Sequence, residues 1–538
     1  MTAALVVSGR IATLAGERGF GWVEAVAIDA GRVVAAGSRA EIEATRGTGT
    51  RTIELAPDEV AIPGLTDAHL HLAEVGLSAG RVDLNGAQTL TDGLARIAEL
   101  NARLPVGAWL LGHGWGPDRW DGWPTADDLS AAAPGRRIAL WAHDHHSLWA
   151  SHTALRAAGI DRDTPDPEGG VIRRLADGSA SGILHENATR LLTATVPPPT
   201  RDEIASGIRR TASQLLALGV VAVHDPGSLS LEAGLGPSIE AYRALAERED
   251  LPIRVHACIR DSQLEAARDA GLGSGDRLCP PSARLVFGWL KLFADGTLGS
   301  RTAALLQPIN GEGHGVWTTD PDALAQMAAE AADHGIATMI HAIGDAAVRS
   351  SLDALAPTAG RTPLMPRIEH IQLLDPGDRP RFARGRVAAS VQPIHLRADA
   401  QIARRTWGRR AEANGYPLAS LVEAGATVAF GTDAPVESID PWPGIELAVT
   451  RRSPEWGGGA DAFGPQEALP LDLALRAACV TAPMIAGERD RGRLIEGQRA
   501  DSAVVQAAAL REPIEGGGPL GRVRPRLVLV EGEVAWEA

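Results

Sequence analysis

Residues 63–72 read PGLTDAHLHL, a short apolar run that ends in two histidines separated by one residue. Such a run predicts a strand over about residues 61–67. Because side chains alternate along a strand, His69 and His71 at its end project to the same side. Two imidazole nitrogens that converge in this way suit Zn2+, Fe2+ or Mn2+. A His-x-His pair alone does not identify a metal site. The assignment depends on whether further metal-binding residues occur elsewhere in the chain.

Downstream of this segment the chain alternates between predicted helices and strands. Thr200-x-x-Glu203 is a capping-box pattern that opens a helix ending near Gly219. Asp320 and Pro321 open another helix, with proline at its first position. Further helices are predicted near residues 345–356, 376–384 and 417–424. Strands are predicted in VVAVHD (220–225), IATMIHA (336–342), RIEHI (367–371), VAASVQ (387–392) and TVAFGTD (427–433).

This alternation predicts an α/β fold with a parallel sheet, and a series of at least six such strands favours a closed TIM-like (β/α)8 barrel over residues 61–489. Residues 1–60 and 490–538 instead consist of short Val- and Ile-rich runs, with Glu531-Gly532 as a hairpin turn. They predict a small β-sandwich domain formed by both termini. Residues from about 73 to 199 hold many of the tryptophans and predict an insertion over the barrel mouth.

Four further residues able to bind metal lie near the carboxyl ends of predicted strands. They are Lys291, His341, His370 and Asp433. Active sites of (β/α)8 barrels are assembled at that end. Chance placement of all four there is improbable, so together with His69 and His71 they predict a metal site.

The order His-x-His, Lys, His, His, Asp resembles the metal signature of the amidohydrolase superfamily. The flanking text is similar to its family 3 branch, which includes N-substituted formamide deformylases. The segments that carry this resemblance are KLFADGTLGSRTA (291–303), HAIGDAAV (341–348), RIEHIQLL (367–374), SVQPIH (390–395) and GTDAPVE (431–437). The resemblance covers nearly the whole chain, including both β-rich ends.

The resemblance implies a role for each of the six residues. His69 and His71 would bind the more buried metal, and His341 and His370 the second. Lys291 would bridge two Zn2+ ions as an N6-carboxylated lysine, with a mononuclear Zn2+ site as the alternative. Asp433 would bind the first metal and act as the catalytic proton shuttle.

Composition gives independent support for Lys291, which is the only lysine among 52 basic residues. A buried, neutral amine can be carboxylated and then offset metal charge. Arginine cannot do so, because it does not deprotonate in proteins. The alternative is that Lys291 is a chance survivor in a salt bridge, for instance with Asp295.

Five residues are candidates for substrate binding, each with a structural alternative. His146 and Glu186 match family positions near the pocket, Trp115 would line the mouth, and Arg301 and His395 would hold a polar or anionic substrate end. The sequence departs from the family pattern at two places. Gly116 follows Trp115 where the family usually has Asp, and Asp144-His145-His146 stands where the family has Asp-Gly-His. Both departures fall in the predicted insertion, so the substrate does not follow by analogy.

The resemblance implies a metal-dependent hydrolase that cleaves a non-peptide C–N bond in an amide, formamide, carbamate or cyclic amide with a metal-activated hydroxide. The same site would serve an ester or lactone hydrolase or a deaminase. A non-catalytic binding relative is a further alternative, although all six ligands are present.

Charge and composition argue against nucleic-acid and membrane partners, so a small-molecule substrate is the partner that we expect. The net charge is −15 and no basic stripe is present, which argues against nucleic acid. No apolar stretch approaches ~18 residues, and the first residues do not resemble a signal peptide. Three scattered cysteines form neither a disulfide framework nor a thiolate metal site. We therefore expect a cytoplasmic protein without membrane contact, and a homo-oligomer such as a dimer is left open.

Overall fold

The computed structural model describes residues 3–78, 80–117, 120, 122–142, 147–227, 234–299, 301–308, 313–456, 461–510 and 519–538. The chain divides into two units, and each is described by itself. The first, which we call the barrel unit, comprises Met1–Glu74 and Ile208–Ala538, and the second unit comprises Val75–Gly207.

The centre of the barrel unit is an eight-stranded sheet in which every neighbouring pair is parallel. Its strands follow one another in sequence order: β6 (Leu65–Asp67), β13 (Val220–Asp225), β14 (Arg254–Arg260), β15 (Leu285–Phe293), β16 (Thr338–Ala342), β17 (Arg367–His370), β18 (Ala388–Val391) and β19 (Val428–Phe430). Strands such as β13 and β16 are buried at every position, as expected when helices cover a parallel sheet. The predicted (β/α)8 barrel is confirmed.

The first and last barrel strands are joined just beyond their carboxyl ends. Backbone N–H groups of Ala68 and Asp433 donate to Phe430 and His69 at 2.9 and 2.7 Å. The Asp67 carboxylate accepts from the backbone N–H of Thr432 at 3.1 Å and from its hydroxyl at 2.7 Å. A Cβ on Gly431 would lie 2.6 Å from the backbone nitrogen of His69, so only glycine permits this approach. These contacts nearly close the barrel and hold the two site-bearing ends together.

Helices alternate with the barrel strands largely where the sequence predicted them. Both halves of the Thr200–Glu203 capping box are present, and Asp320 caps the helix that begins at Pro321. The helix predicted near 376–384 is a 3-10 turn followed by α12. α7 (Arg201–Ala217) begins in the second unit and continues into this one. The other helices of this unit are α8 (Pro237–Glu247), α9 (Leu264–Asp269), α10 (Pro321–Asp333), α11 (Asp345–Leu355), α12 (Arg379–Gly385), α13 (Leu396–Trp407), α14 (Arg409–Asn414), α15 (Leu418–Glu423), α16 (Trp442–Thr450), α17 (Leu471–Arg476) and α18 (Ala482–Ile485).

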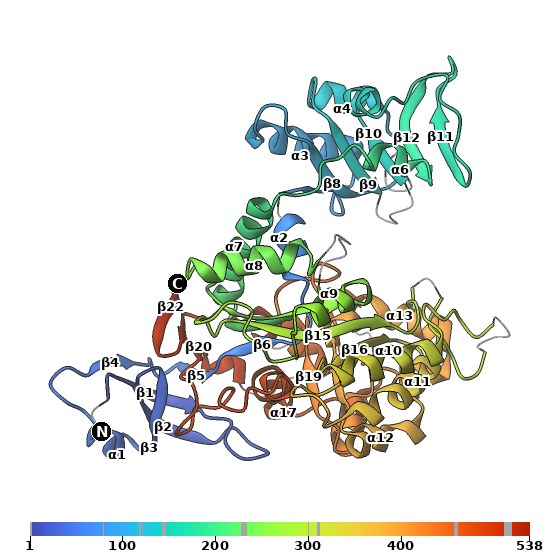
Figure 1. The fold of residues 1–538 in the computed structure, drawn as a ribbon. Coiled ribbons are helices and arrows are strands. Elements are labelled where there is room, and N and C mark those ends of the chain that lie inside the picture. Colours follow the sequence, from blue (N-terminus) through green and yellow to red (C-terminus); the bar gives the residue numbers. More distant parts are fainter. Residues whose placement is uncertain are drawn as a thin grey trace. The chain divides into compact units, whose positions relative to one another are not determined.

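Both ends of the chain contribute to one further sheet, in which strands coloured blue and red lie side by side (Figure 1). Its strands are β1 (Leu5–Ala12), β2 (Trp22–Asp29), β3 (Arg32–Gly37), β4 (Arg51–Glu54), β5 (Glu59–Pro63), β20 (Ser502–Gln506), β21 (Leu527–Val530) and β22 (Glu533–Glu537), and the short helix α1 (Arg39–Glu43) follows β3. β5 pairs antiparallel with β20. The predicted hairpin turn is confirmed, with positive φ at Glu531 and Gly532 between β21 and β22.

The single strand predicted over 61–67 is two strands in different sheets. β5 belongs to the terminal sheet and β6 to the barrel, so residues 61–63 lie outside the barrel. The two are separated by Gly64, where a Cβ would lie 2.8 Å from a methyl group of Val221. A glycine is needed at this point because the chain passes so close to β13.

The second unit, Val75–Gly207, covers nearly the same residues as the insertion predicted at about 73–199. No local pattern in the sequence predicted its sheet. Its six strands lie in the order β11-β12-β10-β9-β8-β7, with β7, β8 and β9 parallel and the others antiparallel. The strands are β7 (Val82–Asp83), β8 (Leu110–Trp115), β9 (Ile138–Ala142), β10 (Ser147–Ala150), β11 (Gly170–Arg174) and β12 (Ala180–Glu186). The helices are α2 (Leu72–Ser78), which leads into the unit, α3 (Leu90–Arg103), α4 (Ala126–Ala132), α5 (His152–Ala157) and α6 (Thr189–Thr193).

The expected location of this unit over the barrel mouth stays a prediction.

Among the described residues, no helix combines the length and the apolar character needed to cross a bilayer.

Candidate metal centre

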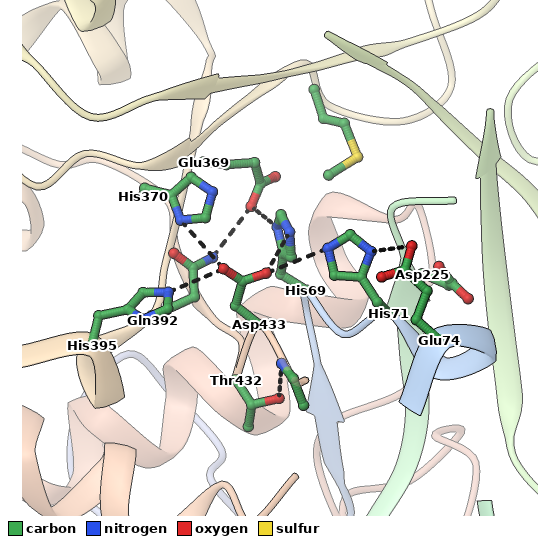
Figure 2. A network of polar contacts seen from close by, with 12 residues as sticks. His69, His71, Glu74, Asp225, Glu369, His370, Gln392, His395, Thr432 and Asp433 are labelled. Atoms are coloured by element: carbon green, nitrogen blue, oxygen red, sulfur yellow. Dashed lines mark hydrogen bonds and ion pairs between the residues drawn. The ribbon is translucent and has the colours of Figure 1, made fainter. Parts of the chain in front are cut away.

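His69 and His71 follow β6 and face the carboxylate of Asp433. Nε2 of His69 lies 3.3 Å from Asp433 Oδ1, and Nε2 of His71 lies 3.5 Å from the same oxygen. The two rings approach with their centroids 5.5 Å apart. The alternation expected at the end of this strand therefore brings both imidazoles to one place, as Figure 2 shows.

Asp433 lies at the centre of the site, three residues after β19 and at a positive φ of 58°. Its second oxygen, Oδ2, accepts a hydrogen bond from His395 Nε2 at 3.1 Å and lies 4.0 Å from His370 Nδ1. Burial works against ionisation, but the surrounding histidines together outweigh it and hold the pKa of Asp433 well below its usual range. The carboxylate is therefore ionised at neutral pH.

His370 ends β17, and His395 lies on the 3-10 turn after β18. With Asp433 they form a group whose ligand atoms all lie within 4.8 Å of one another, and His69, His71 and Asp433 form a second such group. Burial, followed by the proximity of His341, holds the pKa of His370 well below its usual range. His395, expected to contact substrate, is thus placed directly against Asp433.

His341 on β16 borders this cluster without joining either group. Its ring centroid is 4.4 Å from that of His370, but its Nε2 is directed at the carbonyl oxygen of Gly296, 3.0 Å away. Burial and the nearby Lys291 lower the pKa of His341 to about 3, so the ring is neutral. The role predicted for His341 as a ligand of the second metal stays a prediction.

Lys291 on β15 is buried, and its Nζ has no hydrogen-bond partner among the described residues. The Nζ atom lies 5.0 Å from the centroid of the Phe293 ring. Burial lowers the pKa of Lys291 to about 8. Asp295, the salt-bridge partner that we weighed as an alternative, instead accepts backbone N–H groups of Ala304, Ile343 and Gly344 at 2.8 to 3.0 Å.

Glu369, which was not predicted from the sequence, contacts His69 from the side opposite Asp433 (Figure 2). Its Oε2 lies 2.6 Å from His69 Nδ1, and its Oε1 forms an ion pair with Arg367 Nε at 2.9 Å. Burial opposes ionisation, but Arg367 and His69 outweigh it and lower the pKa of Glu369 to about 2. The available signal was strand alternation in RIEHI, which puts Arg367 and Glu369 on one side of β17.

Three of the other candidate substrate residues can be located, and none of their roles is tested. Trp115 is fully buried in the core of the second unit, where its indole N–H donates to Leu140 O at 2.7 Å, which is the packing alternative. Glu186 ends β12 and Arg301 follows β15 in the chain, and both are exposed with positive φ. His146 lies outside the described residues.

The donor set fits a divalent metal. Imidazole and carboxylate ligands suit Zn2+ and similar ions, and two donor groups share Asp433. The buried Nδ1 of His370 and Nζ of Lys291 lack hydrogen-bond partners among the described residues, which is the state expected of atoms that await a ligand.

Comparisons with known proteins agree with this geometry. The sequence model of the Amidohydrolase family matches residues 56–535. "Putative amidohydrolase YtcJ" of Bacillus subtilis (strain 168) is 30% identical over 488 residues, which cover 90% of each chain. N-substituted formamide deformylase of Arthrobacter pascens is 24% identical over 529 residues, which cover 96% of this chain and 95% of the relative.

Among solved structures, an uncharacterized metal-dependent hydrolase from Pyrococcus furiosus superposes with a TM-score of 0.77 at 25% identity. The superposition covers 94% of this chain and all of the other.

Proposed function

The chain belongs to the amidohydrolase family and is a metal-dependent hydrolase, and we propose that it cleaves a non-peptide C–N bond in a small-molecule substrate. The observation that carries the proposal is the position of Asp433, an ionised buried carboxylate among four imidazoles. Support for the bond type comes from the formamide deformylase relative, whose name states its reaction. Amides, formamides, carbamates and cyclic amides are the substrate classes that follow.

The proposed metal ligands are His69 and His71 for one ion and His341 and His370 for a second, with Asp433 on the first. His395 belongs to the same donor group as His370, but its Nε2 carries the proton that it donates to Asp433 Oδ2, so we propose it as a residue that orients Asp433. Zinc is the proposed metal. A divalent ion held here supplies a Lewis acid that makes water more acidic and polarises a carbonyl.

Lys291 is proposed to bridge two ions as a carbamate. A neutral Lys291 amine adds to CO2 and loses a proton, and the product is an anion with two oxygens. The lowered pKa of Lys291, about 8 because of burial, makes the neutral amine accessible near physiological pH. Its buried Nζ, unpartnered among the described residues, is compatible with such a modification.

In the proposed reaction the carbon–nitrogen bond breaks as a carbon–oxygen bond to water forms. Asp433 accepts the proton of the attacking water and passes it to the leaving nitrogen. Its low pKa keeps the carboxylate unprotonated before the reaction, and the hydrogen bond from His395 to Oδ2 fixes its orientation. A substrate contact for Arg301, Glu186 or His146 stays part of this proposal.

A panel of N-formyl amines, hydantoins, N-acyl amino acids and aryl esters tests the bond type, with ammonia release measured in parallel. We expect turnover of at least one amide-type compound by protein that holds one to two equivalents of divalent metal. Asp433→Asn, purified in the same way, controls for contaminating hydrolases. Turnover of esters alone, or ammonia release from an amidine alone, would replace the C–N hydrolase with a lactonase or deaminase. A folded, metal-free preparation that zinc does not activate would contradict the proposed mechanism.

A further inference from the structure

The geometry points to Glu369 and Arg367 as positioning residues that hold the His69 ring with its proton on Nδ1 and its Nε2 directed at the metal site. This inference rests on the proposed function in one respect, namely that His69 is a metal ligand. It concerns residues to which no role has yet been given.

The contact between Glu369 and His69 fixes which ring nitrogen carries the proton. Oε2 of Glu369 lies 2.6 Å from His69 Nδ1, and both side chains are buried. An ionised carboxylate can only accept, so Nδ1 must be the donor. Nε2 is then left as the nitrogen with a free lone pair, and a metal-binding imidazole needs such a lone pair.

The surroundings of Nε2 indicate which group its lone pair binds. Nε2 of His69 faces Oδ1 of Asp433 at 3.3 Å, and Nε2 of His71 faces the same oxygen at 3.5 Å. A lone pair and a carboxylate oxygen at this distance repel each other unless a cation or a proton lies between them. With the His69 proton committed to Glu369, this arrangement favours a metal cation over a proton as the group that joins the two.

Glu369 is in turn held by Arg367, two residues earlier on β17. The ion pair between Arg367 Nε and Glu369 Oε1 measures 2.9 Å, and neither side chain has any exposed surface. Arginine stays protonated in proteins, so the charge of Glu369 is compensated without a proton on its carboxyl. Gln392 Nε2 adds a longer contact to Oε2 at 3.4 Å.

Arg367 itself is fixed from two further sides. Its Nη1 lies 3.0 Å from Nδ1 of His224, and its Cζ lies 4.0 Å above the ring of Trp289. Since arginine has no acceptor, Nδ1 of His224 must accept, which fixes the tautomer of that ring too. The hydrogen bonds from Arg367 to His224 and from His69 to Glu369 therefore have determined directions, and an ion pair joins Arg367 to Glu369 between them.

Glu369→Gln breaks this chain with little change of volume. The introduced amide has one acceptor and one NH2 group, and the NH2 group must face either Nδ1–H of His69 or Nε–H of Arg367, both donors. We expect a loss of zinc affinity of about 10–100-fold, the usual effect of removing a partner of a metal-binding histidine. The measurement is titration of metal-free protein with zinc against a chelating indicator, with the unfolding temperature recorded in parallel.

Glu467→Gln is the matched control. Glu467 is also buried in the barrel unit, but it accepts from the backbone N–H of Ser420 at 2.9 Å and does not touch the cluster around Asp433. It should lose stability and keep the wild-type zinc affinity. If Glu369→Gln also keeps that affinity, or if both variants lose it equally, the inference is wrong. If wild-type protein itself binds no zinc, the proposed function fails instead.

Neutron diffraction from wild-type crystals tests the same inference without a variant, and so decides it even if Glu369→Gln does not fold. We expect deuterium on Nδ1 of His69, directed at Glu369, and none on Nε2. Deuterium on Nε2 would overturn the assignment.

Discussion

The barrel unit and the second unit bury different kinds of side chain. The second unit packs Trp115, Trp120 and Trp149 together, and each indole N–H donates to a backbone carbonyl oxygen at 2.7 to 3.2 Å. The barrel unit buries Lys291, Glu369, Asp433 and several histidines. Of the described residues with a buried polar side-chain atom that lacks a hydrogen-bond partner, only Trp109 belongs to the second unit.

This difference indicates that the candidate metal centre belongs to the barrel unit. Buried polar groups are normally satisfied, because leaving one unpaired costs free energy. In the described part of the second unit, Trp109 alone keeps a buried polar side-chain atom without a partner, so this unit needs little further polar contact. The barrel centre keeps a buried amine and a buried imidazole without hydrogen-bond partners among the described residues, as expected of a site that binds a ligand. Changes in the two units should therefore affect different measurements.

The largest effect is expected from Asp433→Asn in the barrel unit. The amide cannot accept the proton of the attacking water, so kcat should fall by about 10²–10⁴-fold. The unfolding temperature should change far less, and kcat with thermal unfolding on one preparation checks this. Asp378→Asn is the control, because Asp378 is a buried carboxylate that pairs with Arg349 and Arg381. That variant should lose stability and keep kcat, and the opposite pattern would contradict the assignment of Asp433.

Lys291→Arg tests the proposed bridge. Arginine keeps the positive charge but cannot be carboxylated. We expect one of two metal equivalents to be lost while the fold is kept, as measured by elemental analysis and circular dichroism. In wild-type protein supplied with 13C-bicarbonate, NMR should show a carbamate carbon that the variant lacks. Unchanged metal content and activity in Lys291→Arg would exclude the bridge.

The buried histidines of the barrel should make its stability depend on pH. Burial lowers the pKa of His256 on β14 to about 4, whereas an unfolded histidine titrates near 6.5. Between these values the unfolded chain binds a proton that the folded one does not, so stability falls as pH drops from about 6.5 to 4. The contribution is on the order of 3 kcal/mol and is fully present above about pH 6.5.

Urea unfolding across this pH range checks the effect, and His256→Gln should make the profile less steep, because burial also lowers the pKa of His224, His341 and His370 and these residues keep the rest of the slope. His152→Gln, on the surface of the second unit, should leave the profile as in the wild type. A profile that His256→Gln does not change would show that His256 is not its source.

The smallest effect is expected from Trp115→Phe in the second unit. The change removes the hydrogen bond to Leu140 and some buried volume, so the free energy of unfolding should fall by about 1–2 kcal/mol. KM and metal content should stay at wild-type values. A raised KM without loss of stability would restore the substrate contact that we first expected for this residue, and would remove the contrast between the units.

Much of the barrel could be predicted from the sequence. The capping signals at Thr200 and Asp320 and the apolar runs after them depend on neighbours a few residues away, and the structure confirms both helices. The sheet of the second unit could not be predicted, because its strands pair in the order β11-β12-β10-β9-β8-β7 and several of them are short. Such pairings join residues distant in sequence, and no local period encodes them.

The sequence by itself determined the residue types of the site and their place at strand ends, because strand alternation and a single lysine among arginines are visible in one dimension. Only the tertiary structure decided which of them meet. His370, the last residue of β17, and Asp433, three residues after β19, both adopt a positive φ, which sets the direction of each side chain. The tertiary structure also directs His341 toward Gly296, brings His395 against Asp433 and places Glu369 against Nδ1 of His69. The physical reason is that these positions depend on the near closure of the barrel, where Asp67 at the end of β6 accepts from Thr432 after β19, 365 residues along the chain.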